Sequence, residues 1–196
     1  DLHSFPTRRS SDLEPENNAG TANNGMATFY ASLPGIGRAD VRVVASFVTT
    51  SYPAGDLRQS EWYYVGTGAR PGNTYCGKWK SFSQNLPVVR IAEMYLTRAE
   101  CNLVLGTTTG ATPAEDLAQI KNSIRTNSTA PANPTLADVR NERLIELAFE
   151  GQRIHNLKRL QLPTGSFAWN DNKLVFPIPQ REIDATSGTL VQNPGY

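Results

Sequence analysis

The pattern of apolar positions along the chain changes at about residue 87. From Val88 to Leu105 (VVRIAEMYLTRAECNLVL) there is no helix breaker, and apolar residues recur at helical spacing over a broad face. Pro87 suits the first position of a helix, and Gly106 suits its end. The pattern therefore predicts a helix that is packed on two sides.

Two further helices are indicated by signals for their N-terminal caps. The segment Thr112–Glu115 (TPAE) combines a Thr N-cap, a Pro at N1 and a Glu at N3, and predicts a helix that runs to about Arg125. Thr135 opens a second cap signal (TLAD) and predicts a helix from Leu136 toward Leu160. Two antiparallel helices joined by a short loop and followed by a third are compatible with a tetratricopeptide-like unit.

The remaining segments have the composition of loops with short regular pieces. Residues 14–40 are rich in Asn, Gly and Ala, and 41–50 are β-branched enough to form either a short strand or a helix end. Residues 51–86 alternate aromatic and turn residues, which predicts an irregular stretch that could contain a hairpin. Beyond the helices, a short strand is expected at 173–176 and a short turn at 181–185.

The first 13 residues have a different origin from the rest. Asp1–Leu13 (DLHSFPTRRSSDL) lacks the apolar stretch of a signal peptide, and resembles the in-frame translation of a sequencing adapter. We therefore exclude it from the fold and expect a fragment whose natural N-terminus is missing. The expected organisation is an adapter-derived segment at 1–13, a loop-rich aromatic segment at 14–86 and a C-terminal helical region at 87–196.

Composition excludes several classes of function. The 196 residues carry 19 Lys+Arg against 18 Asp+Glu, so no nucleic-acid partner is indicated. No apolar run approaches the roughly 18 to 20 residues that span a bilayer. Cys76 and Cys101 match no zinc spacing, and His155 is the one histidine outside the adapter-like segment, so neither a metal nor a cofactor is expected. Cys101 is expected to be a buried small apolar residue, although the two cysteines could pair in an oxidising compartment.

The third predicted helix carries an unusual set of charges. Glu142, Glu146 and Glu150 stand at i, i+4 and i+8 on one side of the helix, with Arg143 and Arg153 in reach of Glu146 and Glu150. Paired carboxylates could perform acid/base chemistry on a glycosidic bond. Catalytic carboxylates need at least one raised pKa, whereas an arginine within reach of a carboxylate favours its ionised form. We therefore interpret this set as a structural ion-pair ladder.

The sequence indicates binding rather than catalysis. It contains none of the motifs GxSxG, HExxH, GxGxxG or the P-loop. Trp62, Tyr64 and Trp79 lie in loop-like segments, where planar rings could contact the apolar faces of sugars. The alternative interpretation is that these rings pack the loops onto the core.

Two long blocks resemble the SusD/RagB family. Residues 87–100 (PVVRIAEMYLTRAE) are similar to the family helix P-x-x-R-x-A-E-x-Y-L-x-x-A-E. Residues 142–159 resemble E-R-x-x-E-L-x-x-E-G-x-R-x-x-D-L-x-R, with Asn156 in the place of the family's aspartate. The close of the chain, 192–196 (QNPGY), resembles the family's end, and Asp56–Arg58 loosely resembles its D-x-R segment.

The resemblance implies a mainly α, SusD-like fold with a tetratricopeptide-like helix pair, long loops and a few short strands. It further implies an extracellular protein at the outer membrane of Bacteroidetes-type bacteria, held by an N-terminal lipid anchor. Such a protein would capture oligosaccharides or peptides for a SusC-like, TonB-dependent transporter and would not be an enzyme. No binding residue is carried over from the family. The alternative function is a tetratricopeptide-type scaffold that binds proteins or peptides.

Overall fold

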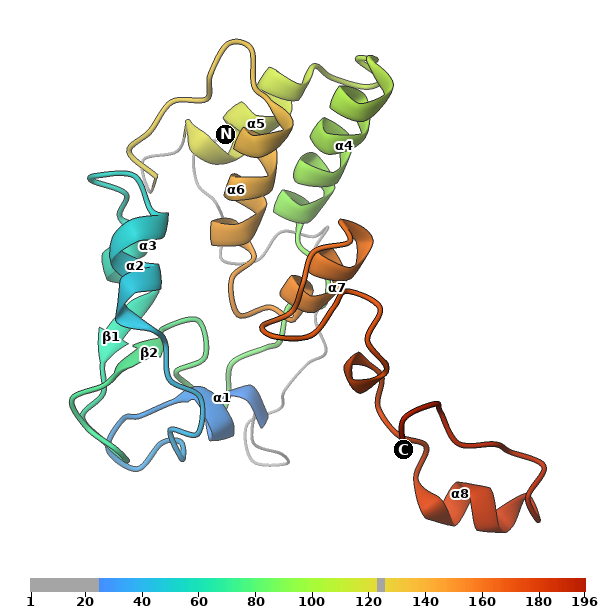
Figure 1. Ribbon diagram of the computed structural model, residues 1–196. Helices are drawn as coiled ribbons and strands as arrows, with labels where there is room; N and C mark the ends of the chain where they lie inside the picture. Colours follow the sequence, from blue (N-terminus) through green and yellow to red (C-terminus); the bar gives the residue numbers. More distant parts are fainter. Residues whose placement is uncertain (1–24, 123–125) are drawn as a thin grey trace. The chain divides into compact units, whose positions relative to one another are not determined.

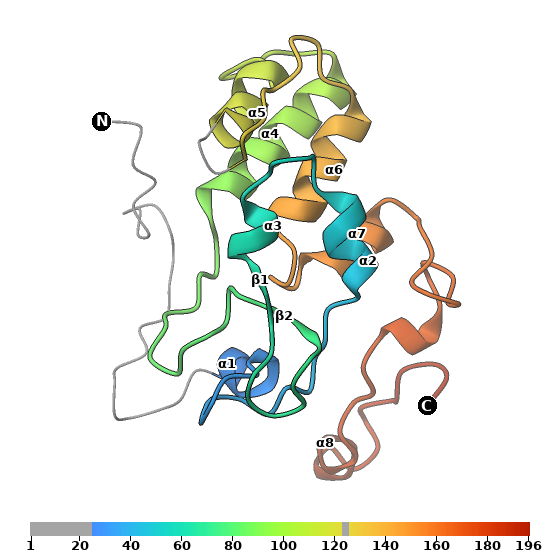
Figure 2. The same cartoon turned by 90° about the vertical axis from the view of Figure 1, so that its left-hand side faces the viewer.

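The computed structural model describes residues 25–122 and 126–196, so the adapter-like segment lies outside the described residues. The described part is mainly helical, as predicted, and its strands form one short antiparallel hairpin (Figures 1 and 2). In chain order the elements are α1 (Gly25–Tyr30), α2 (Ala45–Ser51), α3 (Arg58–Glu61), β1 (Tyr63–Val65), β2 (Thr74–Cys76), α4 (Ile91–Leu105), α5 (Pro113–Lys121), α6 (Leu136–Glu146), α7 (Gln152–Arg159), the 3₁₀ turn η1 (Asn172–Leu174) and α8 (Gln180–Ala185).

The chain divides into two compact units. The first ends at Leu147 and contains α1 to α6 with the hairpin, and the second comprises Ala148–Tyr196 with α7, η1 and α8. The change of sequence pattern at residue 87 therefore falls inside the first unit.

Helix α4 is the centre of the helical core of the first unit. It packs against both α5 and α6, in agreement with the predicted helix pair and following helix (Figure 1). The buried apolar side chains of this core are Ala92, Leu96, Ala99, Leu117, Ile120, Val139 and Leu147. Each buried large aliphatic side chain stabilises a fold by about 1.5–3 kcal/mol, so this cluster holds the three helices together.

The start of α4 differs from the prediction, whereas its end agrees with it. Ile91 is the first helical residue, because Arg90 at the N-cap has an extended backbone (φ −116°, ψ 144°). At the other end, Gly106 adopts the left-handed conformation (φ 64°) that favours glycine after a helix. The extended backbone at Arg90 leads into α4 from a segment without helical structure.

The capping signals of α5 and α6 are confirmed. The Thr112 hydroxyl accepts a hydrogen bond from the backbone N–H of Glu115 (3.2 Å), and the Glu115 carboxylate accepts one from the N–H of Thr112 (2.7 Å). Thr135 and Asp138 form the same reciprocal pair at the start of α6, at 3.2 and 2.8 Å. Each pair satisfies backbone N–H groups that have no partner within the helix.

The single helix predicted from Leu136 toward Leu160 is wrong. The structure has two helices there, α6 and α7, with a turn between them. Phe149 (φ 64°) and Gly151 (φ 81°) in that turn have left-handed backbone conformations, which a right-handed helix cannot contain. Gly151 is the N-cap of α7.

The hairpin expected within residues 51–86 is present. Tyr63 pairs with Cys76 and Val65 pairs with Thr74 across β1 and β2. The β-branched stretch 41–50, which the sequence left open, contributes its second half to helix α2. Helix α1 lies in the segment that was expected to be loop.

The second unit contains turns and short helices where a strand was expected. The strand predicted at residues 173–176 is wrong, since Asn172–Leu174 form a 3₁₀ turn. The side chain of Asp171 accepts a hydrogen bond from the backbone N–H of Lys173 (2.8 Å), which favours the turn over an extended chain. The turn expected at 181–185 belongs to helix α8.

The two cysteines lie in different environments. Cys76 is buried in β2, and Cys101 is exposed on α4, so the prediction of a buried Cys101 is wrong. Both are thiols in the structure. Over the described residues, no helix has the length and apolar character that crossing a membrane requires.

Candidate functional site

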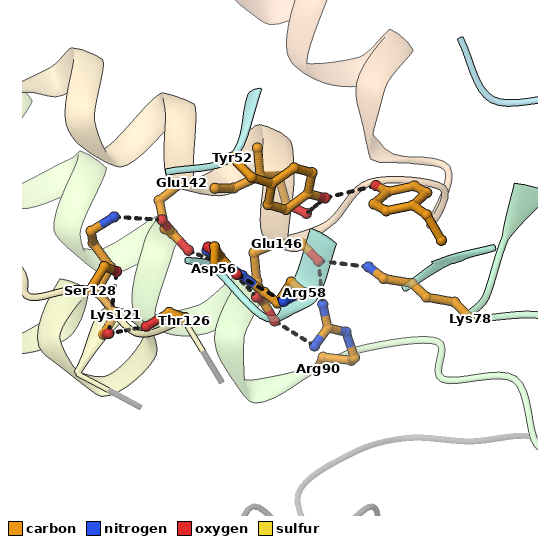
Figure 3. Close-up of polar contacts among 12 residues, drawn as sticks. Tyr52, Asp56, Arg58, Lys78, Arg90, Lys121, Thr126, Ser128, Glu142 and Glu146 are labelled. Atoms are coloured by element: carbon orange, nitrogen blue, oxygen red, sulfur yellow. Dashed lines mark hydrogen bonds and ion pairs between the residues drawn. The ribbon is translucent and has the colours of Figure 1, made fainter. Parts of the chain in front are cut away.

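The fully buried guanidinium of Arg58 lies at the centre of one cluster of charged groups in the first unit. Arg58 on α3 is 0% exposed, and its Nε and Nη2 donate to the Asp56 carboxylate at 3.0 and 2.7 Å. Its Nη1 donates to Glu142 Oε1 (2.5 Å) and to Glu146 Oε2 (2.8 Å) on α6. Three carboxylates therefore surround one arginine (Figure 3).

Further cations neutralise the remaining negative charge. Arg90 contacts Glu146 Oε1 at 2.9 Å, and Lys121 on α5 contacts Glu142 Oε2 at 3.1 Å. Counting Arg58 and the Lys78 ammonium, whose charge also acts on Glu146, four cations thus surround these three carboxylates. Lys78 donates to the backbone carbonyl of Glu146 (2.8 Å) and attaches the segment after β2 to the same helix. Figure 3 shows these groups converging from α3, α5, α6 and the loops.

The electrostatics of this network favour permanent ionisation over acid/base chemistry. Burial by itself would raise the pKa of Glu146, but the positive charges of Arg90, Lys78 and Arg58 outweigh it and hold that pKa below its ordinary value. Burial by itself would lower the pKa of Arg58, but its hydrogen bonds to Asp56 and the charge of Glu142 raise it. A general acid needs a raised carboxyl pKa, so Glu146 does not have the property of one.

The ion pairs of α6 differ in part from those predicted. Glu142 and Glu146 lie one turn apart on α6 and are both buried. Arg143, which the sequence placed in reach of Glu146, binds Glu93 (3.0 Å) and the Thr97 hydroxyl (3.0 Å) on α4. Arg143 therefore joins α6 to α4.

Of the three carboxylates predicted on one side of a helix, only Glu142 and Glu146 lie on α6. Glu150 lies in the turn after α6, and Arg153 is an exposed residue near the start of α7. The left-handed residues of that turn end the helical spacing on which the prediction depended. His155 is exposed on α7, and among the described residues no group of His, Cys, Asp and Glu could hold a metal ion.

Arg58 is the residue that sequence reasoning missed. Neither periodicity nor composition indicates that an arginine in an aromatic, loop-rich stretch is buried. The available signal was the spacing Asp56-x-Arg58, which allows one carboxylate to bind both the side chain and the backbone N–H of Arg58 (2.9 Å).

Trp62 lies between this network and the hairpin. It follows α3 directly and is half-buried. The Lys78 ammonium lies 4.0 Å from the ring centroid, and the Arg58 guanidinium carbon lies 5.7 Å from it. Cation–π contacts of this kind hold the ring in a defined orientation while part of it stays accessible.

Tyr64 on β1 is also half-buried, and its hydroxyl has a structural partner. The hydroxyl accepts a hydrogen bond from the backbone N–H of Ser32 (2.8 Å), and the Lys80 ammonium lies 4.8 Å from the ring centroid. Burial raises the pKa of Tyr64 above its ordinary value. This ring therefore fastens the segment after α1 to the hairpin.

Trp79 requires a correction. The sequence placed it among the exposed ligand contacts, but the structure buries it, with 3% of the residue exposed. Tyr63 and Tyr52 are also buried, and their hydroxyls lie 2.7 Å apart. Burial raises the pKa of Tyr63 to about 12, which agrees with its place in the core. Here the interpretation that rings pack the loops onto the core holds.

The first unit is a helical scaffold built from α4, α5 and α6, the hairpin and the buried ion-pair network. Its loops carry exposed side chains. The sequence pattern of the SusD family matches residues 48–175, more than half of the chain. The chain therefore belongs to the SusD family. No curated protein sequence matches it.

Solved structures share this fold. Surface glycan-binding protein A from Bacteroides thetaiotaomicron is 20% identical, with a TM-score of 0.72 over 88% of this chain and 47% of that protein. A SusD superfamily protein from Parabacteroides distasonis is 18% identical, with a TM-score of 0.72 over 93% of this chain and 49% of that protein. Surface glycan-binding protein A from Bacteroides fluxus is 25% identical, with a TM-score of 0.67 over 90% of this chain and 44% of that protein.

The chain spans about half the length of these proteins. The protein from Bacteroides thetaiotaomicron has also been solved in complex with laminarihexaose, and a further match is a laminarin-binding SusD-like protein. The names of these two proteins describe glycan binding.

Proposed function

We propose that this chain is part of a surface protein that captures oligosaccharides for nutrient uptake. The observation that carries the proposal is membership of the SusD family, together with a fold shared with glycan-binding proteins. The absence of a raised carboxyl pKa at Glu146 is consistent with capture without cleavage. In this proposal the protein acts at the extracellular face of the outer membrane, held by an N-terminal lipid anchor, and passes its ligand to a SusC-like, TonB-dependent transporter.

Trp62 is the proposed ring contact for the sugar, together with Tyr64 two residues further along the chain. The accessible part of the Trp62 ring can face the C–H groups of a pyranose. The Lys78 ammonium next to the ring can donate to sugar hydroxyls. Trp79 is left out of the proposed contacts because it is buried.

Calorimetry with laminarihexaose and a panel of other oligosaccharides tests this proposal on the chain. We expect saturable binding of at least one oligosaccharide, and about a tenfold loss of affinity in Trp62→Ala, the effect of removing one ring contact. Trp169→Ala is the matched control, since Trp169 is a partly exposed tryptophan of the second unit (38%). If no oligosaccharide binds, capture by this chain is refuted; if Trp169→Ala has the same effect as Trp62→Ala, the assignment of the contact is refuted.

A tetratricopeptide-type scaffold is the second candidate, and one observation favours it. Met94, Cys101 and Leu105 are exposed on one side of α4, as a helix that docks another helix would present them. A scaffold of this kind would bind amphipathic helical peptides and no sugar. Binding of such a peptide that is lost in Met94→Lys, without any oligosaccharide binding, would favour this candidate over glycan capture.

A further inference from the structure

Two exposed arginines from different loops meet at one carboxylate near α1. Arg38, in the segment after α1, contacts Asp40 Oδ2 at 3.0 Å, and Arg70, in the loop between β1 and β2, contacts Asp40 Oδ1 at 3.6 Å. The side chains of Arg38 and Arg70 are 65% and 60% exposed. Figures 1 and 2 both place these two loops side by side, and the N–H of Thr67 donates to the carbonyl of Ser32 between them (2.9 Å).

The loop that carries Arg70 is held by buried groups. The hydroxyl of Tyr75 donates to the carbonyl of Arg70 (2.9 Å), and Tyr75 is 0% exposed. The hydroxyl of Ser32, also 0% exposed, donates to the carbonyl of Ala69 (2.5 Å). Arg70 itself has a left-handed backbone (φ 52°), a conformation that is unfavourable for a residue other than glycine. The buried anchors therefore hold an exposed arginine in a strained conformation.

The segment that carries Arg38 is anchored in a similar way. The backbone N–H of Arg38 donates to the carbonyl of Thr28 (2.7 Å), and the backbone N–H of Asp40 donates to the carbonyl of Phe29 (2.9 Å). Ala39 between them is fully buried and is also left-handed (φ 57°). Both arginines thus project from rigid backbone, and rigid backbone lowers the entropic cost of binding a ligand.

The chemistry around Asp40 is that of an anion site with an apolar floor. Arg42 is exposed nearby and donates to the Asn73 side chain (3.3 Å), so three arginines accompany one carboxylate and leave an excess of two positive charges. A guanidinium has five N–H donors in a planar fork, which is more than one carboxylate oxygen satisfies. The Phe29 ring, 46% exposed, lies under Arg38 at 5.4 Å. An exposed aromatic ring beside two guanidinium groups suits a ligand that has both an apolar face and a negatively charged group.

We propose that the cluster Phe29, Arg38, Asp40 and Arg70 binds an acidic oligosaccharide through the carboxylate of a uronic acid or a sulfate ester. This inference rests on the proposed capture of oligosaccharides and names the class of ligand. Arg38 and Arg70 donate charge-assisted hydrogen bonds to the anionic group, and Phe29 contacts the C–H face of the sugar that carries it. The ion pairs with Asp40 hold both guanidinium groups in position before the ligand binds.

Matched ligands test the proposal on the same chain. The carboxylate probe is oligogalacturonate, compared with its fully methyl-esterified form, which has the same sugars without the charge. The sulfate probe is sulfated laminarihexaose, compared with laminarihexaose. We expect the charged member of one pair to bind at least tenfold more tightly than the neutral member, with an affinity that falls as salt is added.

The variants identify the residues. Arg38→Gln and Arg70→Gln should each weaken the charged probe by about tenfold or more, because each removes charge-assisted hydrogen bonds. Arg181→Gln, an 84% exposed arginine of the second unit, is the control and should leave the affinity unchanged. Thermal unfolding midpoints close to that of the unchanged chain would show that the Arg38 and Arg70 variants are folded.

Equal affinity for the charged and neutral members of both pairs would overturn the acidic-ligand proposal and leave glycan capture intact. Tight binding of a charged probe that survives both Arg38→Gln and Arg70→Gln would overturn the assignment to this cluster. Absence of binding by every oligosaccharide, charged or neutral, would refute the proposed function itself.

Discussion

At the scale of single residues, Arg58 couples parts of the chain that are far apart in sequence. It binds Asp56 close by and Glu142 and Glu146 more than eighty residues away. A buried ion pair gains little over a well-packed apolar substitute, because desolvation of both charges is costly. Removing one member of the ion pair strongly destabilises the fold, because the remaining charges are then buried without a partner.

Replacement of Arg58 by Met should therefore strongly destabilise the first unit. Three buried carboxylates would lose their shared partner, and we expect a loss of roughly 3–5 kcal/mol in the free energy of unfolding. Urea unfolding followed by circular dichroism measures this loss. Arg153→Met is the control, because Arg153 is exposed and should change stability by less than about 0.5 kcal/mol. Equal stability of the two variants would contradict the central role of Arg58.

Glu146 predicts a specific dependence of stability on pH. Its pKa in the folded chain lies below the ordinary value of 4.5, so its ion pairs stabilise the fold fully above about pH 4.5. This contribution is lost as the pH falls from 4.5 through the lowered pKa. In Glu146→Gln, we expect a lower free energy of unfolding at pH 7 and a smaller decline as the pH falls below about 4.5.

Urea unfolding over a pH series measures both effects. The control is Glu182→Gln, since Glu182 is half exposed in the second unit and its replacement should give a curve parallel to that of the unchanged chain. A curve for Glu146→Gln that is also parallel would show that Glu146 carries no linked proton.

At the scale of elements, the helices of the core are defined by local chemistry at their ends. The Thr112 and Thr135 caps satisfy N–H groups at the starts of α5 and α6, and Gly106 allows the left-handed turn after α4. These contacts lie within a few residues of one another, which is why sequence reasoning located them.

The cap of α6 should contribute measurably to stability. Thr135→Ala removes the oxygen that accepts from the Asp138 N–H, and we expect a loss of about 1 kcal/mol. Thr135→Ser keeps the hydroxyl and should lose much less. Thermal and urea unfolding of the two variants compares them directly, and an alanine variant as stable as the serine variant would argue against the cap.

At the scale of the whole molecule, one side of the helical core is open to solvent. Met94, Val104 and Leu105 on α4 are 45%, 60% and 72% exposed, whereas Leu96 on the packed side is fully buried. Exposed apolar surface of this kind favours association with other protein surfaces.

Charges on this open side should change association and leave the fold intact. In the double variant Met94→Lys with Leu105→Lys, we expect the free energy of unfolding to change by less than about 1 kcal/mol, because both side chains face solvent. We also expect less self-association of the chain in sedimentation velocity. Leu96→Lys is the contrasting variant and should unfold the core. If the double variant self-associates as strongly as the unchanged chain, the exposed side of α4 is not the surface through which the chain associates.

The sequence by itself determined what depends on neighbouring residues. It predicted the helix pair, the capping boxes, the hairpin and the SusD resemblance, because periodicity and capping act over a few residues. It also indicated that Glu142 and Glu146 are structural, since arginines were close to them in the chain. These features required no knowledge of which segments meet in space.

The tertiary structure alone decided which distant groups come together. It placed Arg58 against Glu142 and Glu146, turned Arg143 toward Glu93, and buried Trp79, since packing and burial depend on contacts between remote segments. The break after α6 was hidden because Phe149, an ordinary helix-compatible residue, adopts a left-handed backbone there. The meeting of Arg38 and Arg70 at Asp40 is of the same kind: two loops carry the arginines, and only the fold brings them to one carboxylate.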